Sequence, residues 1–491
     1  MVDADIKSYK DSLKATSLFG GVQIYNILIT IIRSKVIAIL LGTTGMGING
    51  LYISTVSFLN SLTAFGLGQS SIKYISEANA MGKYEEITKV IVSLRKMVWY
   101  TGFLGTFLCL VLSPYLSLIT FGNYKYTIGF AIVSCTLLFQ QLTSGQTALL
   151  QGLHKYKYMA KANLIGSTVG LLVAIPLYYL FRIDAIIPVL VLTNLISLLV
   201  STFFSKKIKV DQIAVSNKEI KKIGGDMIKM GFMISLSGLI SYLVSYLVRV
   251  YISNRGGIDQ VGLYTAGFAI INTYVGLVFT AMSTDYFPRL SEVNNDQTQF
   301  NNVLNNQMEI ALLLLAPIIV IFIIFVRYMI IILYSSDFLL IENFLYWSIF
   351  AIYFKAISWC IAFSYLAKGD SKLFFINEFS AGLYTLVCNI FCYSLWGISG
   401  LGISYLILYI IYAFQVWVIC RIKYNISLRK NILKIFIKQL PITVICFCFV
   451  LLSPFLKYSL GSIFIILSCI ISYKEINKRV NLKSIFIKKY Y

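Results

Sequence analysis

The sequence predicts an all-α protein that crosses a membrane many times, and three observations lead to this fold class. Of the 491 residues, 58% are hydrophobic and only 13% are charged, which is more apolar surface than a globular core can enclose. Apolar stretches of about 20 residues recur along the chain, each long enough to cross roughly 30 Å of hydrocarbon. A backbone in lipid must satisfy its own hydrogen bonds, and the alternating pattern of barrel strands is absent, so these stretches are predicted to be helices.

About fourteen spans follow from this criterion. They are residues 15–41, 47–72, 91–118, 127–151, 159–181, 184–205, 227–251, 259–287, 307–333, 341–366, 374–395, 400–421, 436–456 and 458–473. The segment before the first span is polar, and the apolar run after it is longer than the core of a signal peptide. The first span is therefore expected to stay attached to the chain.

A sequence pattern near residue 50 recurs near residue 262. Gly50-Leu51-Tyr52 leads through a long apolar stretch to Ile75-Ser76-Glu77, and Gly262-Leu263-Tyr264 leads in the same way to Leu290-Ser291-Glu292. Because the two copies follow spans one and seven, they have the same orientation and should be related by an axis along the membrane normal. Such an internal repeat is typical of transporters.

The repeat predicts two parallel six-helix bundles. Residues 1–205 form the first bundle, residues 206–226 a cytoplasmic linker and residues 227–425 the second bundle. Residues 426–491 then add two further helices and a basic cytoplasmic tail.

The positions of Lys and Arg predict the orientation. If the N-terminus is cytoplasmic, 33 of the 42 basic residues lie in cytoplasmic segments and six lie outside, so the positive-inside rule places both termini in the cytoplasm. The net charge of +22 is explained by this topology and by contacts with anionic membrane lipids. Nucleic acid is therefore not an expected partner.

Metal, cofactor and enzyme sites are not expected. The nine cysteines fall within apolar spans, and His154 is the single histidine. Cys388 and Cys392 lie one helical turn apart but have no histidine or carboxylate beside them in the sequence, so they are interpreted as core residues. Residues 206–226 and 289–305 contain no phosphate-binding glycine loop. The short extracytoplasmic loops leave little room for the active site of a glycan polymerase.

Polar residues inside the spans are the candidate functional residues. In the first span Gln23, Asn26, Thr30 and Arg33 recur at intervals of three and four, which places them on one helix face. We expect that face, together with Gln140 of the fourth span, to line a water-filled cavity. The alternative is that small polar residues at this spacing hold neighbouring helices together.

Charged residues within the spans are further candidates. Arg33 and Lys355 lie far from span ends and are expected to line the cavity, because an intramembrane cation costs about 2.5–3.5 kcal/mol and is rarely kept without a partner or a task. Lys35 and Arg249 either line the cavity or extend their side chains to the interface. Glu378 and Asp285 are candidates to pair with these cations or to titrate.

Several segments along the chain carry a resemblance to a known family. They are Lys35 to Gly42, Gly47, Gly50 to Tyr52, Phe65 to Gly68, Lys73-Tyr74, Val261 to Tyr264, Phe287 to Ser291, Trp347 to Lys368, Glu378 and Gly400 to Gly402. These segments resemble the O-antigen translocases, which are lipid-linked oligosaccharide flippases of the MOP exporter superfamily. The resemblance covers roughly residues 12–425, although Arg33 departs from it because the matching site is often apolar.

The resemblance implies a MATE-like fold and a flippase rather than an enzyme. Such proteins move an undecaprenyl-diphosphate-linked repeat unit of O-antigen, part of lipopolysaccharide, or of a related surface polysaccharide across the bacterial inner membrane by alternating access. It implies membrane lipids, a polysaccharide polymerase and chain-length machinery as partners. Three alternatives stay open: a cell-wall lipid precursor flippase, a MATE-type drug or ion antiporter, whose cavity should carry carboxylates, and an integral-membrane polysaccharide polymerase.

Overall fold

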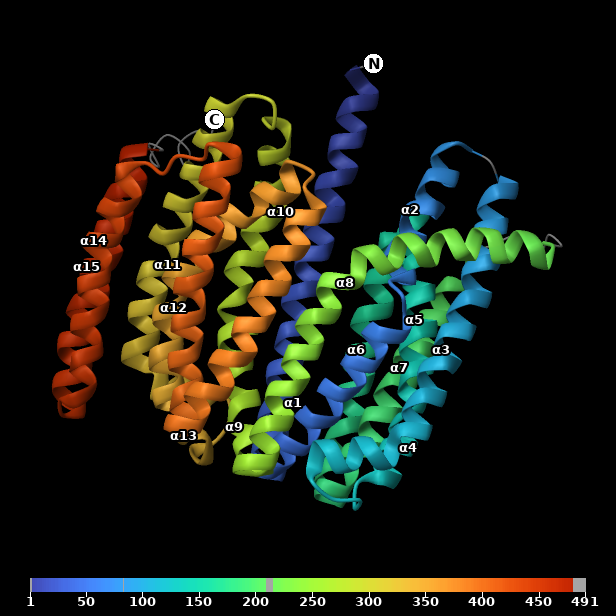
Figure 1. The fold of residues 1–491 in the computed structure, drawn as a ribbon, viewed down its shortest axis with the longest axis horizontal. Coiled ribbons are helices and arrows are strands. Elements are labelled where there is room, and N and C mark those ends of the chain that lie inside the picture. The colour runs from blue at the N-terminus through green and yellow to red at the C-terminus, as the bar shows by residue number, and fades with distance from the viewer. Residues whose placement is uncertain (1, 83, 209–214, 480–491) are drawn as a thin grey trace. The chain divides into compact units, whose positions relative to one another are not determined.

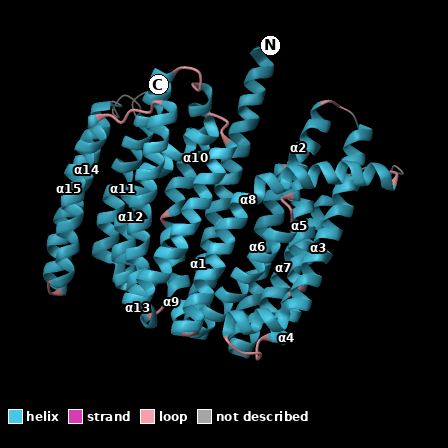
Figure 2. Ribbon diagram, viewed as in Figure 1, coloured by secondary structure: helices cyan, strands magenta, loops and turns pink. Residues whose placement is uncertain are grey.

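The computed structural model describes residues 2–82, 84–208 and 215–479, and helices are the only regular secondary structure in those ranges (Figures 1 and 2). Eleven helical stretches within them are long and apolar enough to cross a membrane. The protein is therefore a multi-pass membrane protein, as predicted. The chain divides into two compact units, one of residues 1–262 with 333–335, and one of residues 263–332 with 336–491.

Unit 1 contains eight helices that lie wholly within its residues, and a ninth helix that continues into unit 2. They are α1 (Val2–Thr63), α2 (Leu67–Ala80), α3 (Tyr84–Phe121), α4 (Thr127–Val133), α5 (Cys135–Gly152), α6 (Tyr156–Phe181), α7 (Ile186–Ser205), α8 (Asn217–Gly256) and the shared α9 (Ile258–Ala269), with the 3-10 turn η1 (Arg182–Ala185) between α6 and α7.

Unit 2 continues from α9 into longer helices. They are the π-helical turn η2 (Ile270–Tyr274), α10 (Gly276–Glu292), α11 (Gln297–Leu333), η3 (Ser336–Ile341), α12 (Glu342–Ala367), α13 (Ser371–Tyr424), α14 (Lys430–Cys448), η4 (Phe449–Leu451) and α15 (Pro454–Arg479).

Two of the helices are too long to cross a membrane once. The 62 residues of α1 would extend about 93 Å at 1.5 Å per residue, roughly three times the hydrocarbon thickness. Gly42 divides α1 because its φ of 66° lies in the left-handed region, which glycine adopts without steric cost. Gly397, with a φ of 58°, divides α13 in the same way. Both breaks fall between spans predicted from the sequence.

Side-chain hydrogen bonds show that α13 folds back on itself at Gly397. Ser404 Oγ donates to Asn389 Oδ1 at 2.8 Å, and Tyr412 OH donates to Glu378 Oε1 at 2.8 Å. Each step forward along one arm is matched by a step backward along the other, so the two arms are antiparallel. The predicted total of about fourteen spans stays a prediction. The two antiparallel arms of α13 correspond to two of these predicted spans.

The unit boundary does not coincide with the predicted domain boundary. Helix α8, the first helix of the predicted second bundle, packs against α1, α2 and α3 and so belongs to unit 1. It begins within the predicted linker 206–226, because Ser216 and Glu219 form a reciprocal capping box at its N-terminus. Residues 209–214 of that linker lie outside the described residues. The predicted division into two six-helix bundles stays a prediction.

Helices α14 and α15, the two predicted additional helices, pack on the other helices of unit 2. Tyr353 of α12 and Thr443 of α14 share a hydrogen bond of 2.7 Å between their hydroxyl oxygens. Gly461 brings α15 against Ile324 of α11. Within the pair, Lys438 forms a 2.8 Å ion pair with Glu475. The two helices are therefore fixed to unit 2 and to each other by polar as well as apolar contacts.

An amide clamp at the start of α11 holds the loop that leads into α14. The clamp consists of Gln297, Asn301, Asn302, Asn305 and Asn306, whose side chains bind residues 424–429. Asn305 binds the backbone twice, donating to the Ser427 carbonyl at 2.8 Å and accepting from the Arg429 N–H at 2.9 Å. The clamp fixes the course of the chain between α13 and α14.

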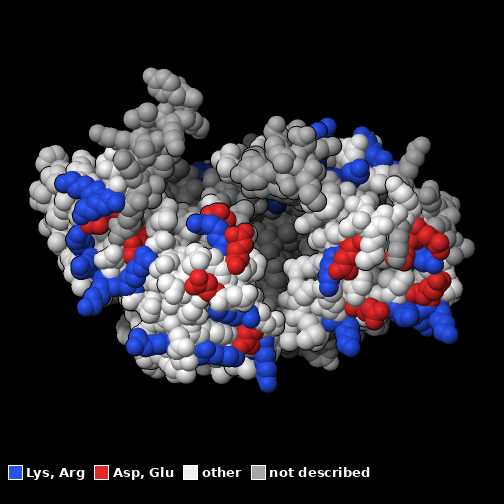
Figure 3. All heavy atoms as spheres, turned by 90° about the horizontal axis from the view of Figure 1, so that it is seen from above, with Lys and Arg blue, Asp and Glu red and all other residues white. Residues whose placement is uncertain are grey.

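Charged side chains gather on the face of the molecule shown in Figure 3, where Lys and Arg are interspersed with Asp and Glu. Several of the charged groups in the predicted cytoplasmic segments are paired, including Lys89 with Glu85 at 2.8 Å. The Lys423 ammonium, which hydrogen-bonds to Asp370, lowers the pKa of that carboxyl below its usual range. The predicted cytoplasmic location of both termini stays a prediction.

Candidate functional site

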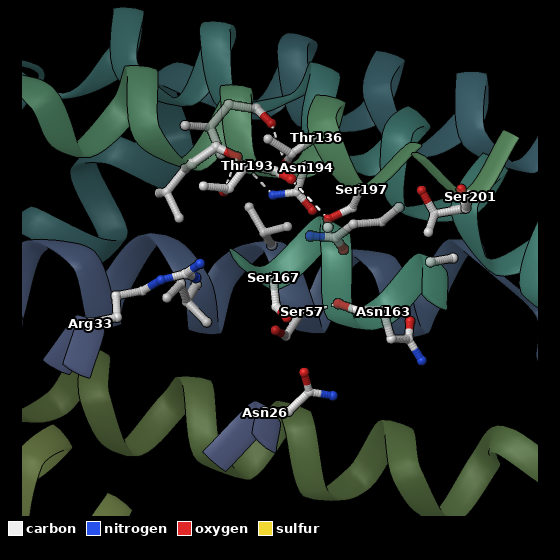
Figure 4. Close-up of a pocket in the computed structure, with 18 residues that line it drawn as sticks. Asn26, Arg33, Ser57, Thr136, Asn163, Ser167, Thr193, Asn194, Ser197 and Ser201 are labelled. Carbon is white, nitrogen blue, oxygen red and sulfur yellow. Dashed lines mark hydrogen bonds between the residues drawn. The ribbon is translucent and has the colours of Figure 1, made fainter. Parts of the chain in front are cut away.

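A polar cavity of about 380 Å³ lies within unit 1 (Figure 4). Its polar lining residues come from α1, α5, α6 and α7. They are Asn26, Arg33, Ser57, Thr136, Gln140, Thr143, Asn163, Ser167, Thr193, Asn194, Ser197 and Ser201. The described residues that line the cavity include one cation, Arg33, and no carboxylate. The cavity therefore combines a single positive charge with many hydroxyl and amide groups.

The α7 row forms one wall of this cavity. We define it as Thr193, Asn194, Ser197 and Ser201. Thr193, Ser197 and Ser201 recur every four residues, so they lie on one face of the helix. The row faces α6, since a Cβ atom at Gly170 would lie 3.5 Å from the Thr193 methyl carbon, an ordinary van der Waals distance. The α7 row therefore has a fixed place beside α6.

Arg33 extends from α1 into this cavity (Figure 4). Its Nε is buried and has no hydrogen-bond partner, and the same holds for Oδ1 of Asn26. Its Nη2 lies 3.6 Å from the position that a Cβ would occupy at Gly170, so the guanidinium is in van der Waals contact with this part of α6. Buried polar groups without partners are costly, and a guanidinium keeps its charge. Arg33 and Asn26 therefore offer binding capacity to a polar ligand.

A second cavity of about 470 Å³ continues the polar surface of unit 1. It shares Gln140, Thr143, Asn194 and Ser197 with the first cavity and reaches Gln69 on α2. The polar lining thus extends from the Arg33 end of the first cavity past α7 and along α5 to α2.

Unit 2 has a separate pocket of about 280 Å³ whose lining includes Lys355 and Glu378. Lys355 Nζ donates to Asn272 Oδ1 at 3.0 Å and to Tyr405 OH at 3.1 Å, and it lies 5.4 Å from the ring centroid of Tyr409. Glu378 accepts its 2.8 Å hydrogen bond from Tyr412. The pocket therefore contains a cation held by an amide, a hydroxyl and aromatic rings, and a carboxylate bound to a tyrosine.

The structure brings together three of the predicted site residues in unit 1. Asn26, Arg33 and Gln140 line the same cavity. Gln23 and Thr30 are exposed and are not among its lining residues, although all four residues of α1 were expected to share one face. A face defined by intervals of three and four is wider than the strip of α1 that borders the cavity.

The remaining predicted residues have other partners. Lys35 donates to the carbonyl oxygen of Tyr334, and Arg249 donates to the Ser245 carbonyl at 3.0 Å. Asp285 forms a 2.6 Å ion pair with Arg289, one turn further along α10, rather than with a cavity cation. The functional roles predicted for all these residues stay predictions.

The sequence interpretation missed the contribution of α6 and α7. Asn163, Ser167 and the α7 row line the cavity but were not among the candidates. A signal was present, because hydroxyl residues recur at intervals of four between residues 193 and 201. It lies within one of the most apolar stretches of the chain, residues 156–205, whose mean hydropathy reaches 2.3.

Comparison with known proteins places the chain in a family. A family model described as "Polysaccharide biosynthesis protein" matches residues 36–342. The chain belongs to this family. A relative from Shigella flexneri, named "Putative O-antigen transporter", is 25% identical over 287 residues, which are 57% of this chain. The match spans 66% of that relative, just under two thirds of its length.

Similar solved structures show the fold of the chain. An inward-facing multidrug resistance MATE family transporter of the MOP superfamily matches with a TM-score of 0.68 at 13% identity, covering 82% of this chain and 94% of that one. The lipid II flippase MurJ, in an inward closed conformation, matches with a TM-score of 0.65 at 16% identity, covering 95% and 99%. The predicted all-α, MATE-like fold is therefore confirmed. The family match and the O-antigen transporter relative confirm the resemblance on which this prediction partly rested.

A third likeness concerns a MOP superfamily transporter from Pyrococcus furiosus, described as having a binding pocket of reverse polarity that suggests a different function. It matches with a TM-score of 0.58 at 14% identity and covers 84% of this chain and 96% of that one. Proteins of one fold thus carry pockets of different polarity, so the fold alone does not assign a substrate.

Proposed function

We propose that this protein is a flippase for lipid-linked saccharides. Its substrate is a polyprenyl-diphosphate-linked repeat unit of O-antigen or a related surface polysaccharide, which it moves from the cytoplasmic to the outer leaflet of the inner membrane. The observation that carries the proposal is the cavity of unit 1, where the Arg33 guanidinium adjoins a wall of hydroxyl and amide groups without a lining carboxylate. Membership of the polysaccharide biosynthesis family supports it.

The chemistry of such a substrate fits the cavity. Arginine binds phosphate oxygens through two parallel N–H groups, and such charge-assisted hydrogen bonds are roughly twice as strong as neutral ones. The hydroxyl and amide groups suit the glycan, which is polar and cannot enter lipid without hydrogen-bond partners. The polyprenyl tail needs no polar site because it is already dissolved in the bilayer.

A MATE-type exporter of cationic drugs is the first alternative, since the fold likeness includes such transporters. The polarity of the cavity opposes it. A cationic drug would meet Arg33 in a low-dielectric site with no lining carboxylate to offset the repulsion. A polymerase is opposed by the relatives, which are named as transporters and flippases.

A flippase for a cell-wall lipid precursor is the nearest alternative. Such a precursor carries the same chemical groups, namely a polyprenyl tail, a diphosphate and a sugar. The two substrates differ in their glycan and in whether the host needs them to survive. An experiment that tests these two properties therefore distinguishes the two flippases.

We propose alternating access as the mechanism and the membrane potential as a driving force. Moving the two negative charges of a diphosphate outward across an inside-negative membrane releases about 4–5 kcal/mol per 100 mV. Collapsing the potential with an ionophore should therefore slow flipping in energised vesicles. An unchanged rate would mean that an ion gradient or consumption of the glycan supplies the direction.

The test of the proposed function is deletion of the gene in its host, followed by treatment of spheroplasts with a membrane-impermeant glycan-modifying enzyme. Single lipid-linked units that accumulate on the cytoplasmic face, protected from the enzyme, are the expected result. Units stranded on the outer face would point to a polymerase, and unchanged glycans with new sensitivity to cationic dyes would point to a drug exporter. Lethality with loss of cell-wall precursor on the outer face would favour the precursor flippase.

The same proposal predicts the location, the orientation and the partners of the protein. The protein would lie in the inner membrane with both termini in the cytoplasm, next to a polysaccharide polymerase and chain-length machinery that consume its product. Protease protection of terminal tags in spheroplasts tests the orientation, and crosslinking followed by purification tests the partners.

A further inference from the structure

We infer that the α7 row is the specificity-determining wall of the cavity and that it selects an uncharged sugar chain rich in hydrogen-bond donors. This inference rests on the proposed function and names the glycan chemistry that the same site accepts. It follows from where the hydrogens of the row are directed, how far the row extends and which of its ends adjoins Arg33.

The donor hydrogens of the α7 row are already used within the helix. Thr193 Oγ1 donates to the Val189 carbonyl at 2.8 Å, Ser197 Oγ to the Thr193 carbonyl at 2.9 Å and Ser201 Oγ to the Leu198 carbonyl at 3.0 Å. A carbonyl oxygen has no hydrogen to give, so in each pair the hydroxyl hydrogen points at the carbonyl. The lone pairs of the hydroxyl oxygens are what the row can present to the cavity.

Asn194 adds a further acceptor to the row. Its Nδ2 donates one of its two hydrogens to the Leu190 carbonyl at 2.8 Å, which leaves one N–H donor and the carboxamide oxygen. The facing helices repeat the arrangement, since Thr136, Thr143 and Ser167 donate to backbone carbonyls of their own segments at 2.6–2.7 Å. A ligand beside these hydroxyl groups must therefore supply hydrogens, whereas the amides of Asn194 and Gln140 can also donate to it.

The length of the row suits more than one sugar. From Thr193 to Ser201 the helix rises about 12 Å, and successive hydroxyls of the row lie about 6 Å apart along its axis. That distance exceeds the size of one sugar ring, so consecutive rings can meet consecutive side chains. Hydroxyl and acetamido groups on sugars supply the O–H and N–H donors that the row requires.

The two ends of the row differ in their distance from the positive charge of Arg33. A Cβ atom at Gly170 would lie 3.5 Å from Thr193 Cγ2 and 3.6 Å from Arg33 Nη2, so the Thr193 end adjoins the guanidinium. Ser201 lies two turns further along α7 (Figure 4). A diphosphate at Arg33 would thus place the first sugar beside Thr193 and later sugars toward Ser201. A carboxylate on those later sugars would face lone pairs and be repelled.

The experiment compares two substrates in proteoliposomes that contain the full-length protein. One is a polyprenyl diphosphate bearing a single neutral sugar, and the other bears a neutral trisaccharide. The double variant Ser197→Ala with Ser201→Ala removes two acceptors distant from Arg33. We expect about a tenfold loss of transport efficiency for the trisaccharide, as two lost hydrogen bonds would produce, and less than a twofold change for the single sugar.

The matched control is Ser205→Ala on the same helix. Ser205 is buried and donates to the Thr202 carbonyl at 3.1 Å, but it does not line the cavity, so the ratio between the two substrates should not change. Because each variant is judged by this ratio within one preparation, partial loss of folded protein affects both substrates alike.

Three results would decide against the inference or its basis. An equal loss for both substrates, or no loss for either, would show that the α7 row does not read the distal sugars. Equal transport of a trisaccharide and its uronic-acid counterpart by the wild-type protein would overturn the selection against acidic sugars. Failure of the wild-type protein to flip either substrate would instead reject the proposed function, an outcome distinct from the other two.

Discussion

Replacing Arg33 should weaken substrate binding without destabilising the protein. The guanidinium is the one cation among the described residues that line the cavity, and its Nε has no partner within the structure. A hydrogen bond to a charged group contributes about 1.5–3 kcal/mol, and each 1.4 kcal/mol is a factor of ten in affinity. Arg33→Gln should therefore raise the half-saturating substrate concentration about 10-fold to 100-fold. Arg33→Lys should lose less, because it keeps the charge but not the two parallel N–H groups.

Stability distinguishes a binding role from a structural one. An intramembrane cation costs about 2.5–3.5 kcal/mol, so Arg33→Gln should leave the melting temperature in detergent unchanged or higher. The assay is flipping of a fluorescent lipid-diphosphate saccharide in proteoliposomes at increasing substrate concentration. Arg182→Gln is the control, because Arg182 is exposed, lies outside the cavity and donates to the Leu40 carbonyl at 3.2 Å. A half-saturating concentration within twofold of wild type, or a loss that only follows reduced folding, would refute the reasoning.

Three further predictions concern unit 2. Lys355→Met should impair transport and lower the melting temperature, because it removes two hydrogen bonds from the partly buried Asn272 and Tyr405, which keep the bond between their oxygen atoms; normal transport would remove Lys355 from the substrate path. Asn305→Leu should destabilise unit 2 by about 1–3 kcal/mol in denaturant unfolding and speed proteolysis near Arg429, since two clamp hydrogen bonds are lost, whereas Asn295→Leu, outside the clamp, should not. Asp370→Asn should lower the melting temperature near pH 7. Because the carboxyl pKa is lowered on folding, this difference should vanish as the pH falls through that lowered pKa, and its persistence in acid would exclude the ion pair as the cause.

Much of the fold could be predicted from the sequence because hydropathy and length are local properties. The spans 15–41 and 47–72 predicted a break that the structure places at Gly42, and the spans 374–395 and 400–421 predicted the turn at Gly397. The unit boundary could not be predicted in this way. The unit boundary depends on which helices α8 packs against, and the sequence pattern of residues 217–256 does not predict those neighbouring helices.

The sequence predicted those site residues whose insertion into a membrane has a high free-energy cost. Arg33 stands out because a cation in lipid is expensive, and the structure places it in the cavity. The α7 row was not predicted, because serine and threonine have a low free-energy cost in a membrane helix when their hydroxyl groups donate to carbonyls of the same helix. The same internal bonds that make the row inconspicuous in the sequence give it its acceptor character.

The amide clamp has a consequence for how sequence variation should be distributed around it. Asn301 and Asn305 bind main-chain atoms of residues 425–429, which every amino acid except proline provides. A saturation-mutagenesis library should therefore tolerate most substitutions at the exposed Ser427 while rejecting nearly all at Asn305. Exposed loop positions such as 427 should therefore vary among descendants of this protein, whereas the asparagines of α11 that bind the loop backbone should be retained.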